Sequence, residues 1–557
     1  MLTSTLLATI VGVATVNAAH GQGSFRVPDL ITKDWILNQA RNSSLFTRWR
    51  PRSHFIAPAG MEVQSIFSST DHGETWKDLG HIIEGPPQGW SVTGFRDPYV
   101  FPSPELDAIR GVGPHYYLTL GSGLKGQTRA TSPNNKRPGF LGARMPLYAA
   151  PASDLKRWSF IGPVWESAPN ASLGHPDVTG SYGYNFETSG IFTLPINRNG
   201  GSSRANSAWF ALMGTEGGNT ALHQHEHWAV WSRGTMSATG GRGGGAKFTP
   251  TSSGAADWGI SYAHTSFVDG RRGNGNRRVM WGWANEDIDD RKNHPIGSWQ
   301  YHVLKAFGYG GCMNLPLELF VKSTPGLRRS STYSDGNEWI PDSKSAYTAQ
   351  TMGIRPLPDV MRLLTNGAIQ KTFNVGVLQA YSAPIKVIQN AGDSWVMKVT
   401  LKPIQGTAGI IIAQSPDNAE YTRIIYDAHA KQIVVQREHS TLLKGVFNTH
   451  TLTGHFEPYT SATGVTENIN FTIVFDKSLV EIFVNDRFAL TTRVYTVRPD
   501  STGISFFAGR ANPATWTQAT IWKGLNKAWP KRPEDSSSRL VWDSPKVTNG
   551  YTYWEGW

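Results

Sequence analysis

The sequence is poor in cysteine: Cys312 is the single one among 557 residues. One cysteine cannot form an internal disulfide, so stability must come from buried apolar surface. The segment around Cys312 shows no histidine–aspartate arrangement that would make the thiol a nucleophile. We therefore predict that Cys312 is a small, buried apolar side chain.

Long apolar runs are also scarce. Residues 6–16 form one apolar stretch, and Val16-Asn17-Ala18 follows it as a small-residue cleavage site. This pattern predicts a secretory signal peptide over residues 1–19 and hence a secreted protein. No later segment is long enough to span a membrane, so no membrane partner is expected. Asn42, Asn170 and Asn470 begin Asn-x-Ser/Thr sequences and are glycosylation candidates in such a compartment.

Nucleic-acid binding is the function that the net charge of +11 would suggest. Much of that charge is scattered through Gly/Ser-rich segments such as 197–206 and 240–247. The sequence shows no recognition helix, zinc pattern or aromatic RNA-binding motif. We predict a basic, solvated surface with no nucleic-acid partner. The sequence implies no cofactor.

Glycine (58) and tryptophan (21) are abundant, and this favours strands joined by tight turns. Residues 69–76 fit the pattern Ser-x-Asp-x-Gly-x-Thr-Trp, the hairpin turn called an Asp box in sialidase-type propellers. A degenerate copy lies at 152–158, and each copy leads into an apolar strand and a Gly-Pro pair. Repeated β-units of this kind predict blades arranged around an axis.

The pattern changes to short alternating strands from about residue 370, which is typical of a β-sandwich. We predict an all-β chain in which residues 24–335 form a β-propeller and residues 366–557 a C-terminal sandwich. Between them, residues 336–365 read as a polar linker with a short helix near 358–364.

Two acidic motifs carry the chemistry: Phe-Arg-Asp-Pro at 95–98 and Asn-Phe-Glu-Thr-Ser-Gly at 185–190. Enzymes usually cleave glycosidic bonds with a pair of carboxylates. Asp97 stands beside Arg96, which keeps a carboxylate ionised and oriented; an ordinary ion pair at a blade edge is the alternative. Glu187 lies between aromatic and small residues on a strand, where an unpaired buried carboxylate is costly.

A metal site is the alternative raised by His223, His225 and His227. On a strand, all three imidazoles would share one face. No carboxylate or cysteine stands at ligand spacing, so we predict no metal and a polar or substrate-facing strand.

These motifs resemble glycoside hydrolase family 32, the invertase, inulinase and fructosyltransferase group, in its fungal form. The matching segments are 52–60, 94–98, 186–190, 281–283, 315–319 and 476–485. The resemblance implies a five-bladed propeller, a sandwich, and a retaining mechanism on β-fructofuranosides such as sucrose or fructans. It implies that Glu187 is the acid/base and Asp97 the transition-state stabiliser, while Arg96, Glu216 and His227 bind substrate.

The chain departs from the family where the nucleophile belongs. That aspartate lies in a Trp-Met-Asn-Asp-Pro-type motif after the His-Phe-x-x-Pro segment, but here Gly60 runs directly into Met61. No Asn-Asp-Pro occurs in the sequence, and residues 125–143 contain a basic insertion. We therefore expect a propeller that lacks much of its first one to two blades, and an impaired catalyst.

Two other interpretations stay open. One is a non-catalytic carbohydrate-binding protein that keeps the wall of the pocket around Asp97 and Glu187. The other is a sialidase-like or arabinan-type propeller enzyme, which the Asp box alone suggests and the sandwich motif opposes.

Misplaced exon boundaries would explain an excision and an insertion in one chain. We expect the natural transcript to encode an additional segment with an Asn-Asp-Pro-type motif between the codons for Gly60 and Met61. Sequencing the message across this junction tests the hypothesis, and an intact message with the same junction contradicts it.

Overall fold

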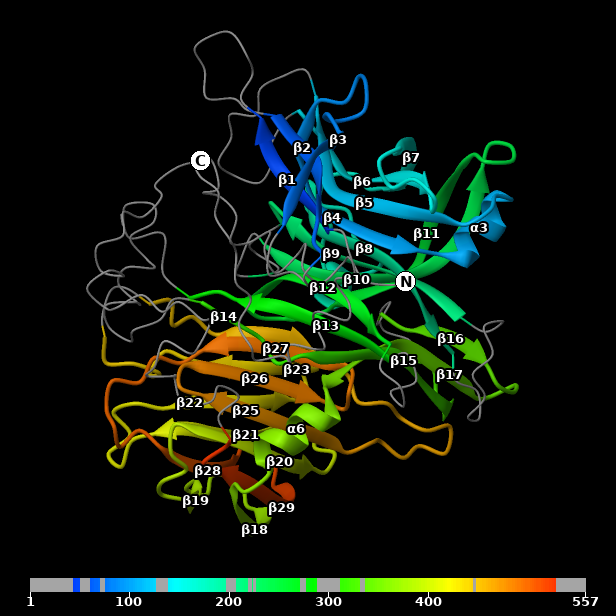
Figure 1. Ribbon diagram of the computed structural model, residues 1–557. Coiled ribbons are helices and arrows are strands. Elements are labelled where there is room, and N and C mark those ends of the chain that lie inside the picture. The colour runs from blue at the N-terminus through cyan, green and yellow to red at the C-terminus, as the bar shows by residue number, and fades with distance from the viewer. Residues whose placement is uncertain are drawn as a thin grey trace, which may run out of the picture.

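The computed structural model describes residues 44–50, 61–70, 76–126, 139–196, 207–218, 223, 227–270, 277–287, 311–330, 336–443 and 447–526 (Figure 1). The predicted signal peptide, Asp71 to Thr75 of the first Asp box, most of the basic insertion and His225 lie outside these residues. Among the helices described, none has the length and apolar character needed to cross a membrane.

Antiparallel sheets follow one another along the first half of the chain, as expected for propeller blades. The first contains β1 (Ser44–Arg50), β2 (Met61–Ser68) and β3 (Lys77–Ile83). The second contains β4 (Val92–Pro102), β5 (His115–Lys125), β6 (Phe140–Pro151) and β7 (Ser159–Glu166). The third contains β8 (Asn185–Pro195), β9 (Ser207–Glu216), β10 (Trp228–Thr239) and β11 (Gly245–Ala255). Short helices α3 (Pro104–Arg110) and α4 (Pro176–Thr179) lie in the connections.

The fourth sheet corrects the predicted linker. It contains β12 (Ser261–Asp269), β13 (Arg277–Ala284), β14 (Cys312–Met313), β15 (Leu317–Leu327), β16 (Glu338–Pro341) and β17 (Tyr347–Pro356). β17 pairs with β15 along nearly its whole length, and β16 pairs with β17. Residues 338–356 therefore belong to the sheet and do not form a linker. The helix expected at 358–364 is present as α6 (Pro358–Thr365).

A two-layered sandwich follows, as predicted. One sheet has the order β18-β29-β20-β25-β26-β27 and the other β19-β28-β21-β22-β23-β24. The strands of the first sheet are β18 (Ile369–Leu378), β20 (Ser394–Leu401), β25 (Ile469–Asp476), β26 (Leu479–Val484), β27 (Phe488–Arg493) and β29 (Ala514–Lys523). Those of the second are β19 (Ile385–Ile388), β21 (Thr407–Gln414), β22 (Thr422–Asp427), β23 (Gln432–Gln436), β24 (Leu452–His455) and β28 (Gly503–Ala508).

Alternation and turn chemistry explain the sandwich strands. Along β20, the side chains of Trp395, Met397 and Val399 are buried in the core between the layers, and the Trp395 ring stacks on Phe475. The β26–β27 hairpin turns at Asn485 and Asp486, whose φ angles are 47° and 52°. Positive φ at both turn residues matches the twist of the flanking strands, and Asn and Asp tolerate it.

The degenerate Asp box forms the turn between β6 and β7. The Asp154 carboxylate accepts a hydrogen bond from the Lys156 amide (3.1 Å), and Trp158 Nε1 donates to the Leu155 carbonyl (2.7 Å). The Trp158 ring packs against the apolar cluster that contains Phe95 and Leu118. A short acidic turn therefore anchors the edge of this blade.

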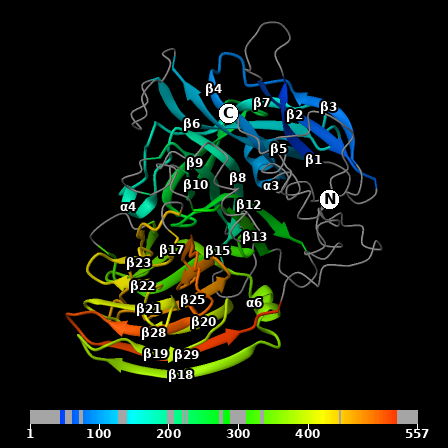
Figure 2. The same ribbon diagram turned by 90° about the vertical axis from the view of Figure 1, so that its left-hand side faces the viewer.

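The sandwich and the fourth sheet lie side by side in both views (Figures 1 and 2). Buried polar contacts join the sandwich to this part of the chain. The Asp257 carboxylate accepts from the amide and the hydroxyl of Thr491 on β27 (3.1 and 2.7 Å). Arg493 pairs with Glu286 (3.2 Å) and donates to the thiol of Cys312 (3.1 Å), which is half-buried and not the apolar core residue expected. These contacts fix the two parts against each other.

A further buried contact between the two parts is the ion pair of Arg437 with Asp287, and it can be tested by mutation. The side chains are fully buried and 2.5 Å apart. Arg437→Met leaves the Asp287 charge buried without its partner, so we expect a loss of about 3–5 kcal/mol in stability. Calorimetry should show a lower and broader unfolding transition. Arg498→Met, at an exposed pair with Asp417, serves as the control with little change; equal effects from both variants would contradict the prediction.

Candidate functional site

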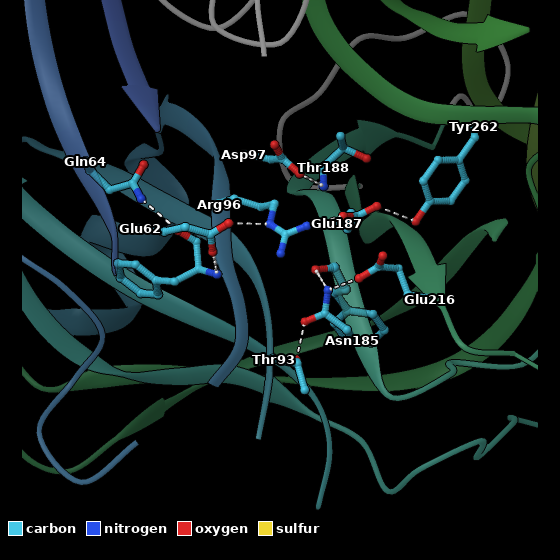
Figure 3. Close-up of polar contacts among 12 residues, drawn as sticks. Glu62, Gln64, Thr93, Arg96, Asp97, Asn185, Glu187, Thr188, Glu216 and Tyr262 are labelled. Atoms are coloured by element: carbon cyan, nitrogen blue, oxygen red, sulfur yellow. Dashed lines mark hydrogen bonds and ion pairs between the residues drawn. The ribbon is translucent and has the colours of Figure 1, made fainter. Parts of the chain in front are cut away.

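The structure brings together the acidic residues that the sequence singled out. Asp97 lies on β4, Glu187 on β8 and Glu216 at the end of β9, and His227 directly precedes β10 (Figure 3). The amide of Thr188, next to Glu187, donates to the Asp97 carboxylate (3.2 Å). The two acidic motifs therefore share one site between adjacent blades.

The same backbone irregularity occurs on the first strand of three successive blades. The ladder shifts register between Arg96 and Tyr99 on β4, between Glu187 and Gly190 on β8, and between Tyr262 and Thr265 on β12. In each shift two residues oppose a single residue of the partner strand, as in a β-bulge. The first of the two residues has positive φ in each case: 61° at Asp97, 47° at Thr188 and 51° at Ala263.

These bulges carry a backbone conformation that non-glycine residues rarely adopt. A strained φ persists only where surrounding contacts enforce it, and such positions cluster at functional sites. A bulge also re-aims the side chains beside it. The three bulges thus turn Asp97, Glu187 and Tyr262 toward one another at the meeting point of the blades.

Two glycines allow the blades to approach this closely. Gly121 pairs with Arg96 and Gly214 pairs with Glu187 in the ladders. A Cβ on Gly121 would lie 2.3 Å from the Phe186 carbonyl, and one on Gly214 would lie 2.7 Å from the Tyr262 ring. Any other residue at either position would push the neighbouring blade away.

Arg96 is the cation of the site. Its Nε donates to Glu62 Oε1 (2.8 Å) and its Nη1 to Glu187 Oε1 (2.9 Å). Burial acts to lower the pKa of the guanidinium, but Glu62, Glu187, Glu216 and Asp97 outweigh it and raise the pKa above its usual value. Arg96 therefore stays charged and neutralises part of the acid cluster.

Of Glu187, Asp97 and Glu216, Glu187 retains its proton most strongly. Burial, reinforced by the nearby charges of Glu216 and Asp97, raises the pKa of its carboxyl to about 8, although Arg96 and His227 act in the opposite direction. Tyr262 donates its hydroxyl to Glu187 Oε2 (2.9 Å). With 14% of its side chain exposed, this carboxyl can still exchange a proton with a bound molecule.

Asp97 responds to a different balance of forces. Burial raises the pKa of its carboxyl to about 6, while Arg96 and the Thr188 amide act to lower it. At neutral pH, Asp97 is ionised and Glu187 is protonated. Two neighbouring carboxyls whose pKa values are pushed apart are the arrangement that acid–base chemistry requires.

Glu216 is held in its charged form. Burial opposes this, but the hydrogen bond and charge of His227, together with Arg96 and Asn185, lower the pKa of Glu216 below its usual value. His227 Nε2 lies 3.4 Å from Glu216 Oε1, and Asn185 Nδ2 donates to Oε2 (2.6 Å). Asn185 is itself fixed by the Thr93 hydroxyl (2.6 Å).

Glu187, Glu216 and His227 offer ligand atoms within 4.8 Å of one another, the spacing that a cation would need. Their observed contacts are with Arg96, Tyr262, Asn185 and each other, so charge pairing already explains the cluster. The alternation in the sequence predicted that His223 and His227 share one face of a strand. His223 lies outside any strand, and its ring stacks on Trp228 with centroids 4.4 Å apart.

Sequence reasoning missed Glu62, Asn185 and Tyr262 as members of the site. Asn185 begins a motif that was recognised, so its nearness to Glu187 was a usable signal. Tyr262 and Glu62 reach the site from 75 and 34 residues away, and no local pattern marks them.

A cavity of about 280 Å³ lies elsewhere, between the fourth sheet and the sandwich. Trp339, Tyr459 and Arg487 are among its lining residues, and none of the clustered acids is. We place the site at the acids because their geometry and proton affinities point to chemistry there.

Comparison with known proteins supports the resemblance. Residues 359–523 match the model of the glycosyl hydrolases family 32 C-terminal domain. No curated protein sequence matches the chain.

Several solved structures share the fold over most of the chain. A β-fructofuranosidase from Aspergillus kawachii complexed with glycerol is 24% identical, with a TM-score of 0.73, and the match covers 88% of this chain and 83% of that one. A fructosyltransferase from A. japonicus is 22% identical, with a TM-score of 0.72 and coverage of 88% and 85%. An exo-inulinase from Aspergillus awamori is 18% identical, with a TM-score of 0.58 and coverage of 87% and 80%. These likenesses show the β-propeller and β-sandwich fold.

Glu187→Gln should change how stability depends on pH. Because the folded protein binds this proton more tightly than the unfolded chain, the contribution of Glu187 is complete below about pH 4.5 and is lost as pH rises through about 8. The variant lacks this titration, so we expect it to become more stable than the wild type above pH 8, by on the order of 3 kcal/mol. Unfolding measured from pH 5 to pH 9 tests this, and parallel pH profiles would refute it.

Proposed function

We propose that the chain, whose residues 359–523 match the family 32 C-terminal domain, is a member of glycoside hydrolase family 32 and a secreted glycosidase of the β-fructofuranosidase type. Its substrates would be sucrose or fructans. The observation that carries the proposal is the geometry of two carboxyls on adjacent blades: Glu187 binds Arg96, and Asp97 accepts from the Thr188 amide beside Glu187.

Glu187 would be the general acid. A carboxyl that keeps its proton at neutral pH can transfer it to the glycosidic oxygen as the bond from that oxygen to the anomeric carbon breaks. The leaving group then departs as a neutral alcohol, and positive charge develops on the fructosyl ring. Tyr262, hydrogen-bonded to Glu187 Oε2, orients this carboxyl.

Asp97 would stabilise that developing charge. Its ionised carboxylate can accept hydrogen bonds from ring hydroxyls and interacts most strongly with the cation-like transition state. Glu216 and His227 present further polar groups at the same site and would bind other hydroxyls of the sugar.

A retaining reaction also needs a carboxylate nucleophile that forms a covalent glycosyl intermediate. The family resemblance assigns this task to an Asn-Asp-Pro aspartate, and the sequence contains no such motif. We therefore expect the chain as written to bind β-fructofuranosides and to cleave them slowly, without an efficient first displacement.

The same absence favours a second candidate function, a non-catalytic carbohydrate-binding protein. In that case the acid cluster would recognise the hydroxyls of a fructose-containing sugar and no bond would break. Binding without turnover distinguishes it from the first candidate.

Glu187→Gln tests the proposed chemistry. We expect fructose release from sucrose or inulin to fall about 100-fold or more, because general acid catalysis contributes 10²–10⁴-fold. Sugar binding, followed by calorimetry, should stay within a few-fold because the amide keeps the shape of the side chain.

Glu318→Gln is the matched control, since Glu318 pairs with Arg355 in the fourth sheet (2.9 Å), away from the acid cluster. Sugar binding with no turnover in the wild type would favour the second candidate. Turnover unaffected by Glu187→Gln would remove Glu187 from its assigned role, and an absence of sugar binding would refute both candidates.

A further inference from the structure

Glu62 is an acid of the site to which neither the motifs nor the proposed chemistry assigns a role. It lies at the start of β2, with 19% of its side chain exposed. Its Oε1 accepts from Arg96 Nε (2.8 Å) and its Oε2 from the Phe95 amide (2.5 Å). Both oxygens therefore bind consecutive residues of β4, a strand in a different sheet (Figure 3).

Gln64 completes this contact from the same face of β2. Two residues along a strand, its side chain points the same way as that of Glu62. Gln64 is fully buried, and its Nε2 donates to the Phe95 carbonyl (3.0 Å). Glu62 and Gln64 thus hold the amide and the carbonyl of Phe95, the residue before Arg96. The first blade fixes the backbone from which the cation projects.

Glu62 also shares that cation with Glu187. The guanidinium of Arg96 binds Glu62 through Nε and Glu187 through Nη1, so the two carboxyls are no further apart than two hydrogen bonds and the width of the guanidinium. The negative charge of Glu62 repels a second negative charge at Glu187 and so offsets part of the attraction that Arg96 exerts there. Glu62 therefore weakens the hold of Arg96 on the ionised form of Glu187.

We propose that Glu62 is a positioning residue: it fixes Arg96 between the blades and offsets part of the charge that Arg96 presents to Glu187. The proposal rests on the proposed function only in taking Glu187 as the proton donor. Among the described residues, the other titratable groups that face Glu187 include Asp97 on β4, Glu216 on β9, His227 and the Tyr262 hydroxyl.

Glu62→Gln separates this role from mere support of the fold. The amide keeps the length of the side chain and one acceptor oxygen for Arg96, but it loses the bond from the Phe95 amide and removes the charge. Arg96 then acts more fully on Glu187, and the titration midpoint of Glu187 should fall by about one pH unit. A residue that only holds the blades together would change the unfolding temperature and leave the midpoint in place.

The titration can be followed directly by carbon-13 NMR of protein labelled at glutamate carboxyls, with Glu187→Gln used to assign the Glu187 signal. This measurement needs no turnover, so it is independent of whether the chain is an efficient enzyme. Loss of the proposed function would appear as an absence of sugar cleavage and binding, while failure of the present inference would appear as an unchanged Glu187 midpoint.

Glu318→Gln is again the control, because Glu318 is an equally buried glutamate (17% exposed) paired with an arginine. In the Glu318→Gln variant, the titration midpoint of Glu187 should equal that of the wild type. Should Glu62→Gln fail to fold, Glu62→Asp replaces it: the shorter carboxylate cannot reach both N–H groups, and the midpoint should fall in the same direction by a smaller amount. A Glu187 midpoint that stays at the wild-type value in the folded Glu62 variant overturns the proposal.

Discussion

The site depends on one partly buried cation, Arg96, which is shared among several acids. Arg96 binds Glu62 and Glu187 directly, and its charge also acts on Asp97 and Glu216. Without that charge, burial and mutual repulsion would raise the pKa values of Glu187 and Asp97 further. With it, the acids divide: Glu216 is held ionised and Glu187 retains its proton. The acids differ because His227, Arg96 and Asn185 together hold Glu216 in its charged form, whereas at Glu187 burial and the charges of Glu216 and Asp97 outweigh Arg96.

Backbone geometry is what gives that guanidinium its neighbours. The bulges on β4, β8 and β12 each lie on the first strand of a blade. Their sequences differ: Arg-Asp-Pro on β4, Glu-Thr-Ser on β8 and Tyr-Ala-His on β12. Repetition of the bulge from blade to blade therefore reflects the architecture, and each blade places a different side chain on it. Small residues on the partner strands, such as Gly121 and Gly214, then let the bulges meet.

Sequence alone predicted the local elements well and the long-range ones poorly. Alternating apolar residues identified β20, the Asn485-Asp486 pair identified the turn after β26, and Pro358 marked the start of α6. The polar composition of 336–345 suggested a linker, but β16 and β17 pair with β15 because the backbone of a polar segment can complete a ladder. The same reasoning overlooked α3, even though Ser103 caps it and Gly111 ends it in a left-handed conformation.

The acid cluster shows which residues of the site can be predicted from sequence and which cannot. Asp97 and Glu187 were found because each stands in a recognisable motif, whereas Glu62 is an isolated acid whose partners are chosen by the packing of β2 against β4. The nucleophile that the family resemblance requires is a different matter, since a further aspartate here would add negative charge beside Glu187. Like charge favours the protonated form, so its presence would raise the proton affinity of Glu187 further. The raised proton affinity of Glu187 therefore follows from the described residues alone.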